Sequence, residues 1–573
     1  MRPPAGARRL LLWAAAALPA AGAALFLVLR SGQIPNLDYW WLFPRFFGPA
    51  GFAADPGAWF SRSNEHLLTG SYLLYAVNIL ATRGSNVGLG LLAWLAALAQ
   101  YALLCRHLAR TGEEPGFWRA AAVAAFCFTP AAAQVWIVGF SGVHWCWANL
   151  LAVVSLLALL RYLERGGVLH LAAHVAAGLA ATLTFGSALA LWPAALFAVA
   201  RHAPLRVAAG YAAGVFALAA AYRAGMPAAA GALGDLQAVP VYVGSFLGGI
   251  FIFSLELACL IALAGLLLAG HFAWRLRSAP ADRAPWLWVL LALFALGNAL
   301  LAAVARDGGG PRGAISSRYA LVAGLFWLSL LQLGFIAYPP RQDWRRRGLR
   351  LAWAAAGLAM ILAMARIGAL YAPQLLQRAS LQPLVELTAE LGIEDDELIR
   401  AAITVDPAAW RRALPVLRAH RLEPFASPAL PCGDDGEWNG RSFPLPDRRG
   451  GGRLERIDAL GPGVARVSGW LWGRPSGGTC LLLLDRGRRL RGFGLATLPV
   501  DDSRTRFLGY VRVPRPDSVF TAVLADPSRE PRRLRGSVSL TRTGAAGIDP
   551  TFAQLHRAGR WYGRGKWTWL RGD

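Results

Sequence analysis

Two short segments near the N-terminus combine residue types that carry out acid–base chemistry with residue types that bind phosphate. Asp38 lies in NLDYWW at positions 36–41, and Glu65 and His66 lie beside an arginine in SRSNEHLLTG at positions 61–70. A carboxylate can take a proton from an attacking hydroxyl group. A guanidinium group can balance a phosphate leaving group through charge-assisted hydrogen bonds. The two segments therefore predict transfer from a phosphate-linked donor to a hydroxyl acceptor.

Each of these side chains also has a purely structural interpretation. Asp38 could be the N-cap of a surface helix that follows it, because aspartate is a common capping residue. Glu65 could bind the acceptor or phosphate, but starting an apolar helix at the membrane interface explains it slightly better. His66 could be a pH-sensitive hydrogen-bonding group near the mouth of a cavity, or it could also mark that helix start.

A second set of candidates lies farther along the chain. Arg312 and Arg318 belong to the glycine-rich segment DGGGPRGAISSRY at positions 307–319, where Arg318 could reach a lipid phosphate. The structural alternative is an arginine whose head group extends from a helix end to the interface. Glu256, within FIFSLELACLIALAG, is predicted to be an intramembrane polar site, since acids inside apolar segments are costly and usually functional or paired.

The elements that position these residues are predicted to be membrane-spanning helices. The chain of 573 residues is 56% hydrophobic and only 16% charged, whereas soluble domains have about 25% charged residues. A span needs about 20 apolar residues, and residues 1–371 contain enough such runs for about 11–12 spans. The first run is residues 10–29, and 168–200 could be one span or two. Another apolar run covers residues 242–268.

Charge patterning predicts the orientation of these spans. Arginine clusters at 275–283 and 341–350 mark cytoplasmic loops, so the N-terminus should be cytoplasmic and the chain beyond Tyr371 extracytoplasmic. We attribute the net charge of +25 to this topology and to contact with membrane lipids, and we predict no nucleic-acid partner. The predicted location is a bacterial inner membrane.

The C-terminal third is predicted to be an α+β tail. Residues 372–430 show leucines at helical spacing, and residues 431–573 are predicted to be a β-rich module. Its short apolar runs from about Gly461 onward are typical of an antiparallel β-sandwich. Cys432 and Cys480 could form a disulfide there if the tail faces an oxidising compartment. Trp470, Trp472 and Tyr510 could stack on sugar rings, although core packing is the commoner role of such residues.

The order of elements in residues 1–371 resembles the C-type (GT-C) membrane glycosyltransferases, which have many helices and an acid in a large first external loop. Asp38 in NLDYWW lies at the place of that acid. The resemblance implies transfer of a sugar from a polyprenyl-phosphate donor to an envelope glycan, lipid or protein acceptor on the outer face. Asp38 would then be the general base, and Arg318 would contact the donor phosphate.

Two other functions remain open. A transporter or flippase of lipid-linked glycans would need a polar path across the membrane and would make Glu256 more important than Asp38. A non-catalytic scaffold would use the tail to bind envelope glycans. The sequence contains no Walker A motif, dinucleotide fingerprint or zinc signature, so we predict neither a cofactor nor a metal.

Overall fold

The computed structural model of the chain divides into two compact units. Unit 1 comprises Met1–Ser31, Arg45–Thr82 and Asn86–Leu375, and unit 2 comprises Gly32–Pro44, Arg83–Ser85 and Leu376–Asp573. The structure describes residues 5–63, 66–110, 117–224, 237–276, 285–305, 310–338, 344–403, 405–426, 442, 449–473, 479–499, 503–513, 517–525 and 532–539.

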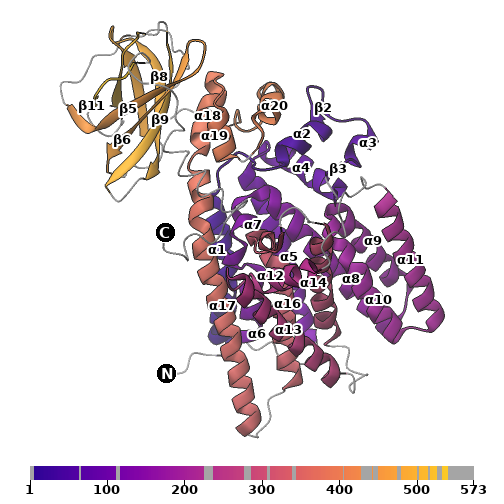
Figure 1. Cartoon of the computed structure of the whole chain (residues 1–573). Coiled ribbons are helices and arrows are strands. Elements are labelled where there is room, and N and C mark those ends of the chain that lie inside the picture. The colour runs from indigo at the N-terminus through magenta and orange to yellow at the C-terminus, as the bar shows by residue number, and fades with distance from the viewer. Residues whose placement is uncertain are drawn as a thin grey trace. The chain divides into compact units, whose positions relative to one another are not determined.

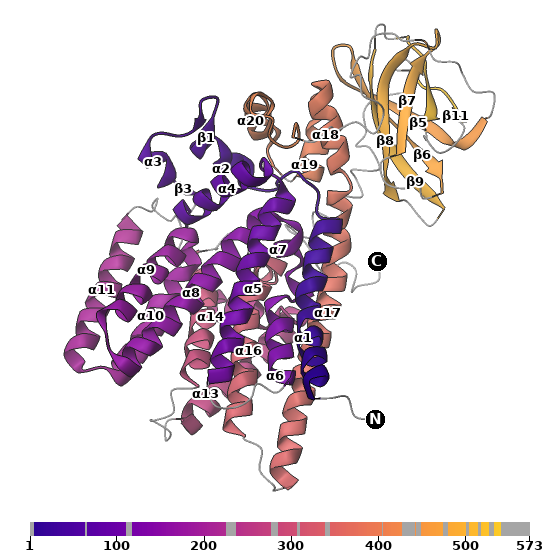
Figure 2. The same ribbon diagram turned by 180° about the vertical axis from the view of Figure 1, so that it is seen from behind.

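Long apolar helices dominate unit 1, and Figures 1 and 2 show α1, α5, α8 and α17 running in roughly the same direction. The helices up to residue 379 are α1 (Ala5–Arg30), α2 (Tyr39–Phe46), α3 (Pro56–Trp59), α4 (Thr69–Thr82), α5 (Asn86–Arg110), α6 (Phe117–Cys127), α7 (Ala133–Ile137), α8 (Gly139–Arg165), α9 (Val168–Thr184), α10 (Leu191–His202), α11 (Leu205–Ala224), α12 (Ala238–Gly248), α13 (Leu255–Leu276), α14 (Trp286–Ala305), α15 (Gly310–Gly313), α16 (Ala320–Ala337) and α17 (Trp344–Ala379). Among the described residues, eight helices are long and apolar enough to cross a membrane, and three apolar helices are shorter. These helices indicate a membrane-embedded protein.

Several of the predicted spans are broken helices. Residues 168–200 form α9 and α10 with the 3₁₀ turn η2 (Gly186–Ala190) between them, and residues 242–268 are divided between α12 and α13. After α6, the 3₁₀ turn η1 (Pro130–Ala132) precedes α7. Irregular backbone at membrane depth is tolerated where protein covers it. Most residues of these turns are buried, namely Ala131 and Ala132 in η1 and Gly186, Ala188 and Ala190 in η2, which makes the breaks candidates for a polar site.

The junction between α7 and α8 shows how one such break is stabilised. Asn86, the first residue of α5, donates its side-chain Nδ2 to the carbonyl of Ile137 at 2.9 Å, and its Oδ1 accepts from the backbone nitrogen of Gly139 at 2.9 Å. A Cβ at Gly139 would lie 2.5 Å from the Asn86 carbonyl oxygen, so only glycine fits there. One buried amide therefore satisfies two backbone groups that the break leaves free.

The described residues of unit 2 after α17 form three short helices and a barrel. The helices are α18 (Gln382–Leu391), α19 (Asp396–Ala402) and α20 (Pro407–Ala419). Asp395 and Asp406 cap α19 and α20, because their carboxylates accept backbone N–H groups of Leu398 and Ala408 at 3.1 Å. The predicted helical segment 372–430 differs in detail, since α17 continues to Ala379 before α18 begins.

The segment Gly32–Pro44 belongs to unit 2 because specific contacts hold it to the helices there. The Gln382 side chain binds both backbone groups of Ile34, accepting from its nitrogen at 2.9 Å and donating to its oxygen at 3.0 Å. The Leu37 nitrogen donates to the Ile403 oxygen at 2.9 Å. Asp38 therefore lies in a segment that packs with residues more than three hundred positions later in the chain.

The C-terminal strands form a closed barrel, which corrects the prediction of a sandwich. The strands are β5 (Arg449–Gly461), β6 (Val464–Trp472), β7 (Thr479–Asp485), β8 (Leu490–Pro499), β9 (Arg504–Arg512), β10 (Phe520–Ala525) and β11 (Arg532–Arg535). Their order around the barrel is β10-β11-β5-β6-β9-β8-β7, and β10 pairs with β7 to close it. One pairing, β11 with β5, is parallel. Closure leaves the sheet without exposed edges, which a pair of open sheets would retain.

Candidate functional site

Polar and aromatic side chains from distant parts of unit 1 meet where several helices begin or end. They come from β3 (Arg62–Ser63), β4 (His66–Leu67), α4, α8, the α9–η2 junction and α11. We call this group the His66 cluster, and its members are Arg62, His66, Ser71, Tyr75, His144, Phe185 and Tyr222.

Arg62 is held against Tyr222 and keeps one donor available. Its Nη2 donates to the Tyr222 carbonyl oxygen at 2.8 Å, and its guanidinium carbon lies 4.6 Å from the centre of the Tyr222 ring. The Tyr222 hydroxyl accepts from the backbone nitrogen of Leu67 at 3.0 Å. The second terminal nitrogen, Nη1, is buried and has no hydrogen-bond partner among the described residues. A buried donor of this kind is a site where an anion gains strong hydrogen bonds.

His144 is fixed in one orientation by two hydroxyl groups. Ser71 Oγ lies 2.7 Å from His144 Nδ1 and donates its proton to the Thr184 carbonyl oxygen at 2.8 Å. Because that proton is used, Nδ1 is the donor to Ser71, and Tyr75 donates its hydroxyl to Nε2 at 2.8 Å. His144 thus uses both ring nitrogens inside the protein and acts as a rigid support beneath the cluster.

His66 lies close to this support at the glycine-containing break after α9. Its ring centre is 4.2 Å from that of Phe185, and Phe185 stacks on His144 at 5.3 Å. A Cβ at Gly186 would lie 2.8 Å from His66 Nδ1 and 2.3 Å from the Tyr222 hydroxyl. Only glycine allows both side chains to approach the backbone at this point. The helix break at Gly186 therefore positions His66 beside Tyr222.

Arg318 is connected to the cluster by a row of aromatic rings. It lies in the 3₁₀ turn η4 (Ser317–Tyr319), with its guanidinium carbon 5.0 Å from the centre of the Tyr319 ring. Tyr319 contacts Trp145 at 5.6 Å, and Trp145 contacts Phe185 at 4.7 Å. The Nε atom of Arg318 is buried without a hydrogen-bond partner among the described residues. Arg312 is exposed in α15, six residues earlier.

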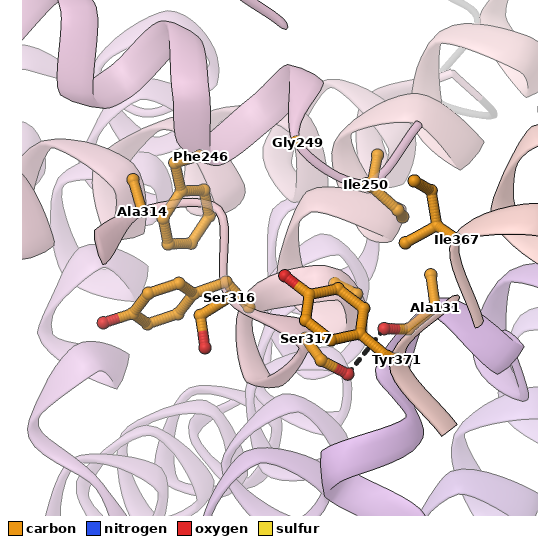
Figure 3. A pocket seen from close by; sticks show the side chains of 11 residues that line it. Ala131, Phe246, Gly249, Ile250, Ala314, Ser316, Ser317, Ile367 and Tyr371 are labelled. Carbon is orange, nitrogen blue, oxygen red and sulfur yellow. Dashed lines mark hydrogen bonds between the residues drawn. The ribbon is translucent and has the colours of Figure 1, made fainter. Parts of the chain in front are cut away.

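A small cavity lies beside η4 and is shown in Figure 3. Its volume of about 10 Å³ is at the lower limit for a single water molecule, so it cannot hold a sugar or a phosphate group. Ser317 Oγ donates to the Ala131 carbonyl oxygen at 2.6 Å across one wall. Tyr371, at another wall, donates its hydroxyl to the Ile315 oxygen at 2.8 Å. These bonds join η1, η4 and α17 and fix the turn that carries Arg318.

The other predicted residues lie outside the His66 cluster. Asp38, in unit 2, is exposed directly before α2, and its backbone oxygen accepts from Trp41 and Leu42 at 3.0 and 3.1 Å, as at an N-cap position. Glu65 lies outside the described residues. Glu256 is not deep within a helix, because it occupies the exposed first turn of α13 and accepts from Ser254 Oγ at 2.8 Å.

The predicted disulfide involves one cysteine that the structure describes. Cys480, in β7, is disulfide-bonded, and Cys432 lies outside the described residues, so their pairing stays a prediction. Cys105, Cys127 and Cys146 are free and buried, as expected of small core residues. No group of three or more His, Cys, Asp or Glu side chains within the described ranges could hold a metal ion.

Local sequence patterns indicated only part of the His66 cluster. Ser71 and Tyr75 are four residues apart and therefore share one face of α4, and His144 lies in an irregular aromatic segment. The contact between Arg62 and Tyr222 could not be predicted from the sequence, because nothing in the local pattern links the end of α11 to β3. No protein-family model, no curated protein and no solved structure matches the chain.

Proposed function

We propose that the chain is a membrane glycosyltransferase that moves a sugar from a polyprenyl-phosphate donor to an acceptor of the cell envelope. The observation that carries the proposal is the buried Nη1 of Arg62, which has no hydrogen-bond partner among the described residues, beside His66 and Tyr222. A lipid-linked donor keeps its chain among apolar helices while its phosphate stays at the level of the helix ends. A guanidinium group at helix ends suits that phosphate.

Two arginines are assigned to the donor phosphate. Arg62 offers its free Nη1, and Arg318 offers its buried Nε. A row of aromatic rings, formed by Tyr319, Trp145 and Phe185, extends from Arg318 to the His66 cluster. Arginine keeps its charge at all relevant pH values and can bind phosphate oxygens with two parallel bonds. Arg312 is a further phosphate contact, and His66 binds the acceptor or the phosphate.

Asp38 is assigned the role of general base. Its carboxylate takes the proton of the acceptor hydroxyl while the hydroxyl oxygen bonds to the anomeric carbon of the sugar. The bond between that carbon and the phosphate oxygen breaks, and the polyprenyl phosphate leaves with the electron pair. Guanidinium groups that bind the phosphate stabilise the negative charge that develops on it. The exposure of Asp38 supports this role, because a base must be able to reach an incoming hydroxyl group.

The test compares variants in membranes that contain matched amounts of protein, using a panel of polyprenyl-phosphate sugars as donors. Arg62→Gln should raise the apparent KM for the donor by about 10-fold to 100-fold, since a hydrogen bond to a charged group contributes about 1.5–3 kcal/mol. Asp38→Asn should lower kcat by about 100-fold to 10,000-fold, while asparagine preserves the N-cap of α2. Arg165→Gln, at the exposed C-terminal end of α8, is the matched control.

Two outcomes would contradict the proposal. Full activity of the Asp38→Asn variant would remove Asp38 from the chemistry and restrict it to helix capping. A donor KM that is the same in Arg62→Gln and wild type would show that Arg62 does not bind the phosphate. The control variant should keep both constants unchanged.

A further inference from the structure

The outer face of strand β6 carries two tryptophans that meet in open solvent. Trp472 is 59% exposed, and its ring centre lies 4.6 Å from that of Trp470 with the two planes at 77°. The alternate residues Val467 and Leu471 point into the barrel and are fully buried. Trp472 therefore contributes nothing to the core, and its exposure needs another explanation.

One row of side chains on β6 shows that only part of this face is covered. Arg466 and Trp472 are separated by an even number of residues and therefore lie on the same face. Arg466 is 4% exposed because Asp395 and Glu397 of the α19 segment pair with it. Trp472, at the other end of the row, is exposed to solvent. Among the described residues of the barrel, it is the only large apolar side chain with strong exposure.

Charged side chains surround the two tryptophans. Strand pairing places Arg453 and Arg506 opposite Trp470, and Arg504 opposite Trp472, so all three arginines lie on the outer face. Figure 2 shows β6 between β5 and β9, the strands that carry them.

Glu455 is the acidic residue of this surface within the described range. Its carboxylate accepts from Trp470 Nε1 at 2.8 Å and lies 3.8 Å from Arg506 Nη1. It therefore fixes the orientation of Trp470 and lies beside one of the three guanidinium groups. Arginine side chains thus border an exposed aromatic face. We call these residues the Trp472 patch, and its members are Arg453, Glu455, Trp470, Trp472, Arg504 and Arg506.

We propose that the Trp472 patch binds an acidic saccharide chain. The C–H face of a pyranose ring stacks on Trp472, and carboxylate groups on neighbouring sugars pair with Arg453, Arg504 and Arg506. A membrane or a protein partner would favour a broader apolar surface than one strongly exposed side chain. The patch lies wholly within unit 2 and is independent of the transfer chemistry proposed for the His66 cluster.

The test uses the full-length protein in nanodiscs of zwitterionic lipid. An oligogalacturonide and its fully methyl-esterified form of the same length are titrated by calorimetry, so that only the carboxylate charge differs. Wild type should bind the acidic form more tightly, and added salt should weaken that binding. Trp472→Ala should weaken it by about tenfold, which is the effect expected from losing one aromatic contact.

Further variants separate the contributions of stacking and charge. Arg453→Gln combined with Arg506→Gln should remove the preference for the acidic form and leave binding of the methyl ester unchanged. Trp118→Ala is the matched control, because Trp118 is 71% exposed but lies in α6. Unfolding temperatures should match among all variants.

Two results would overturn the proposal. Equal binding of the acidic oligosaccharide by wild type and Trp472→Ala would show that the patch is not the site. Binding to vesicles of anionic lipid that requires Trp472, without any saccharide binding, would assign the patch to a membrane surface.

Discussion

The two units bury polar side chains in different ways. In unit 1 a histidine lies between a serine and a tyrosine hydroxyl at two separate places, which are His144 with Ser71 and Tyr75, and His174 with Ser155 and Tyr211. In unit 2 the buried group is an arginine between carboxylates. Arg466 bonds Asp395 at 2.9 Å and Glu397 at 2.7 Å, and the Tyr510 hydroxyl donates to Asp395 at 2.9 Å.

The difference follows from the surroundings of each site. Burial by itself lowers the pKa of Arg466, but Asp395 and its neighbours raise it above the ordinary value, so the guanidinium remains charged. This pair joins α19 to the outer face of β6. In unit 1, hydroxyl groups bind the two histidines, and Arg119 of α6, which is also buried, donates its Nε to the Gln332 side chain at 2.8 Å. A neutral hydrogen-bond partner avoids burying a second charge among apolar helices.

Removing the charge of Arg466 should produce the largest effect on stability. Arg466→Met leaves Asp395 buried without its cation, which should cost about 3–5 kcal/mol. Thermal unfolding, monitored through the protease resistance of the barrel, measures this loss of stability. The double variant with Asp395→Asn should recover part of it, because a neutral amide then replaces the fully buried carboxylate and asparagine still caps α19. If the Arg466→Met variant were as stable as wild type, the comparison between the two units would be contradicted.

Removing one hydroxyl from unit 1 should have a smaller effect. Tyr75→Phe leaves the Nε2 of His144 without its donor, which should cost about 1–3 kcal/mol. Unfolding temperature in detergent is the measurement, and Tyr211→Phe at the His174 site should behave alike. If Tyr75→Phe destabilised the protein as much as Arg466→Met, the distinction between the two modes of burial would be wrong.

The smallest effect should appear at low pH in the β7–β8 turn. Partial burial of Asp485 alone would raise its pKa, but the Arg489 backbone N–H and the Arg491 guanidinium lower it below the ordinary value. Its contribution to stability is therefore complete above the unfolded pKa of about 3.9 and is lost as pH falls through the lower folded pKa. In the Asp485→Asn variant, the unfolding temperature of the barrel should depend less on pH in this acid range. An unchanged acid slope would show that Asp485 does not contribute.

Local pattern was sufficient for much of the fold. Apolar runs of span length correspond to helices such as α14 and α16, and the short apolar runs predicted from about Gly461 onward include β6 and β9. These elements could be predicted because hydrophobic length and period are properties of a few neighbouring residues.

Strand β5 and the closed barrel could not be predicted in this way. In RGGGRLERIDALG the residues Leu454 and Ile457 both point into the core, because a bulge between them shifts the alternation. The charged residues on the outer face also make this strand harder to recognise from its hydrophobic pattern. Closure depends on the pairing of β10 with β7 and of β11 with β5, which are far apart in the sequence.

Local sequence pattern predicts an apolar helical body, a β-rich C-terminal module, and acid, histidine and arginine residues near the first spans. The contact of His66 with Tyr222 and His144 became apparent only in the folded chain, as did the place of Asp38 in unit 2, which depends on contacts of its neighbours with Gln382 and Ile403. The physical reason is that such contacts depend on complementary surfaces formed by distant segments. A local pattern of hydrophobic and polar residues carries no information about which surfaces will meet.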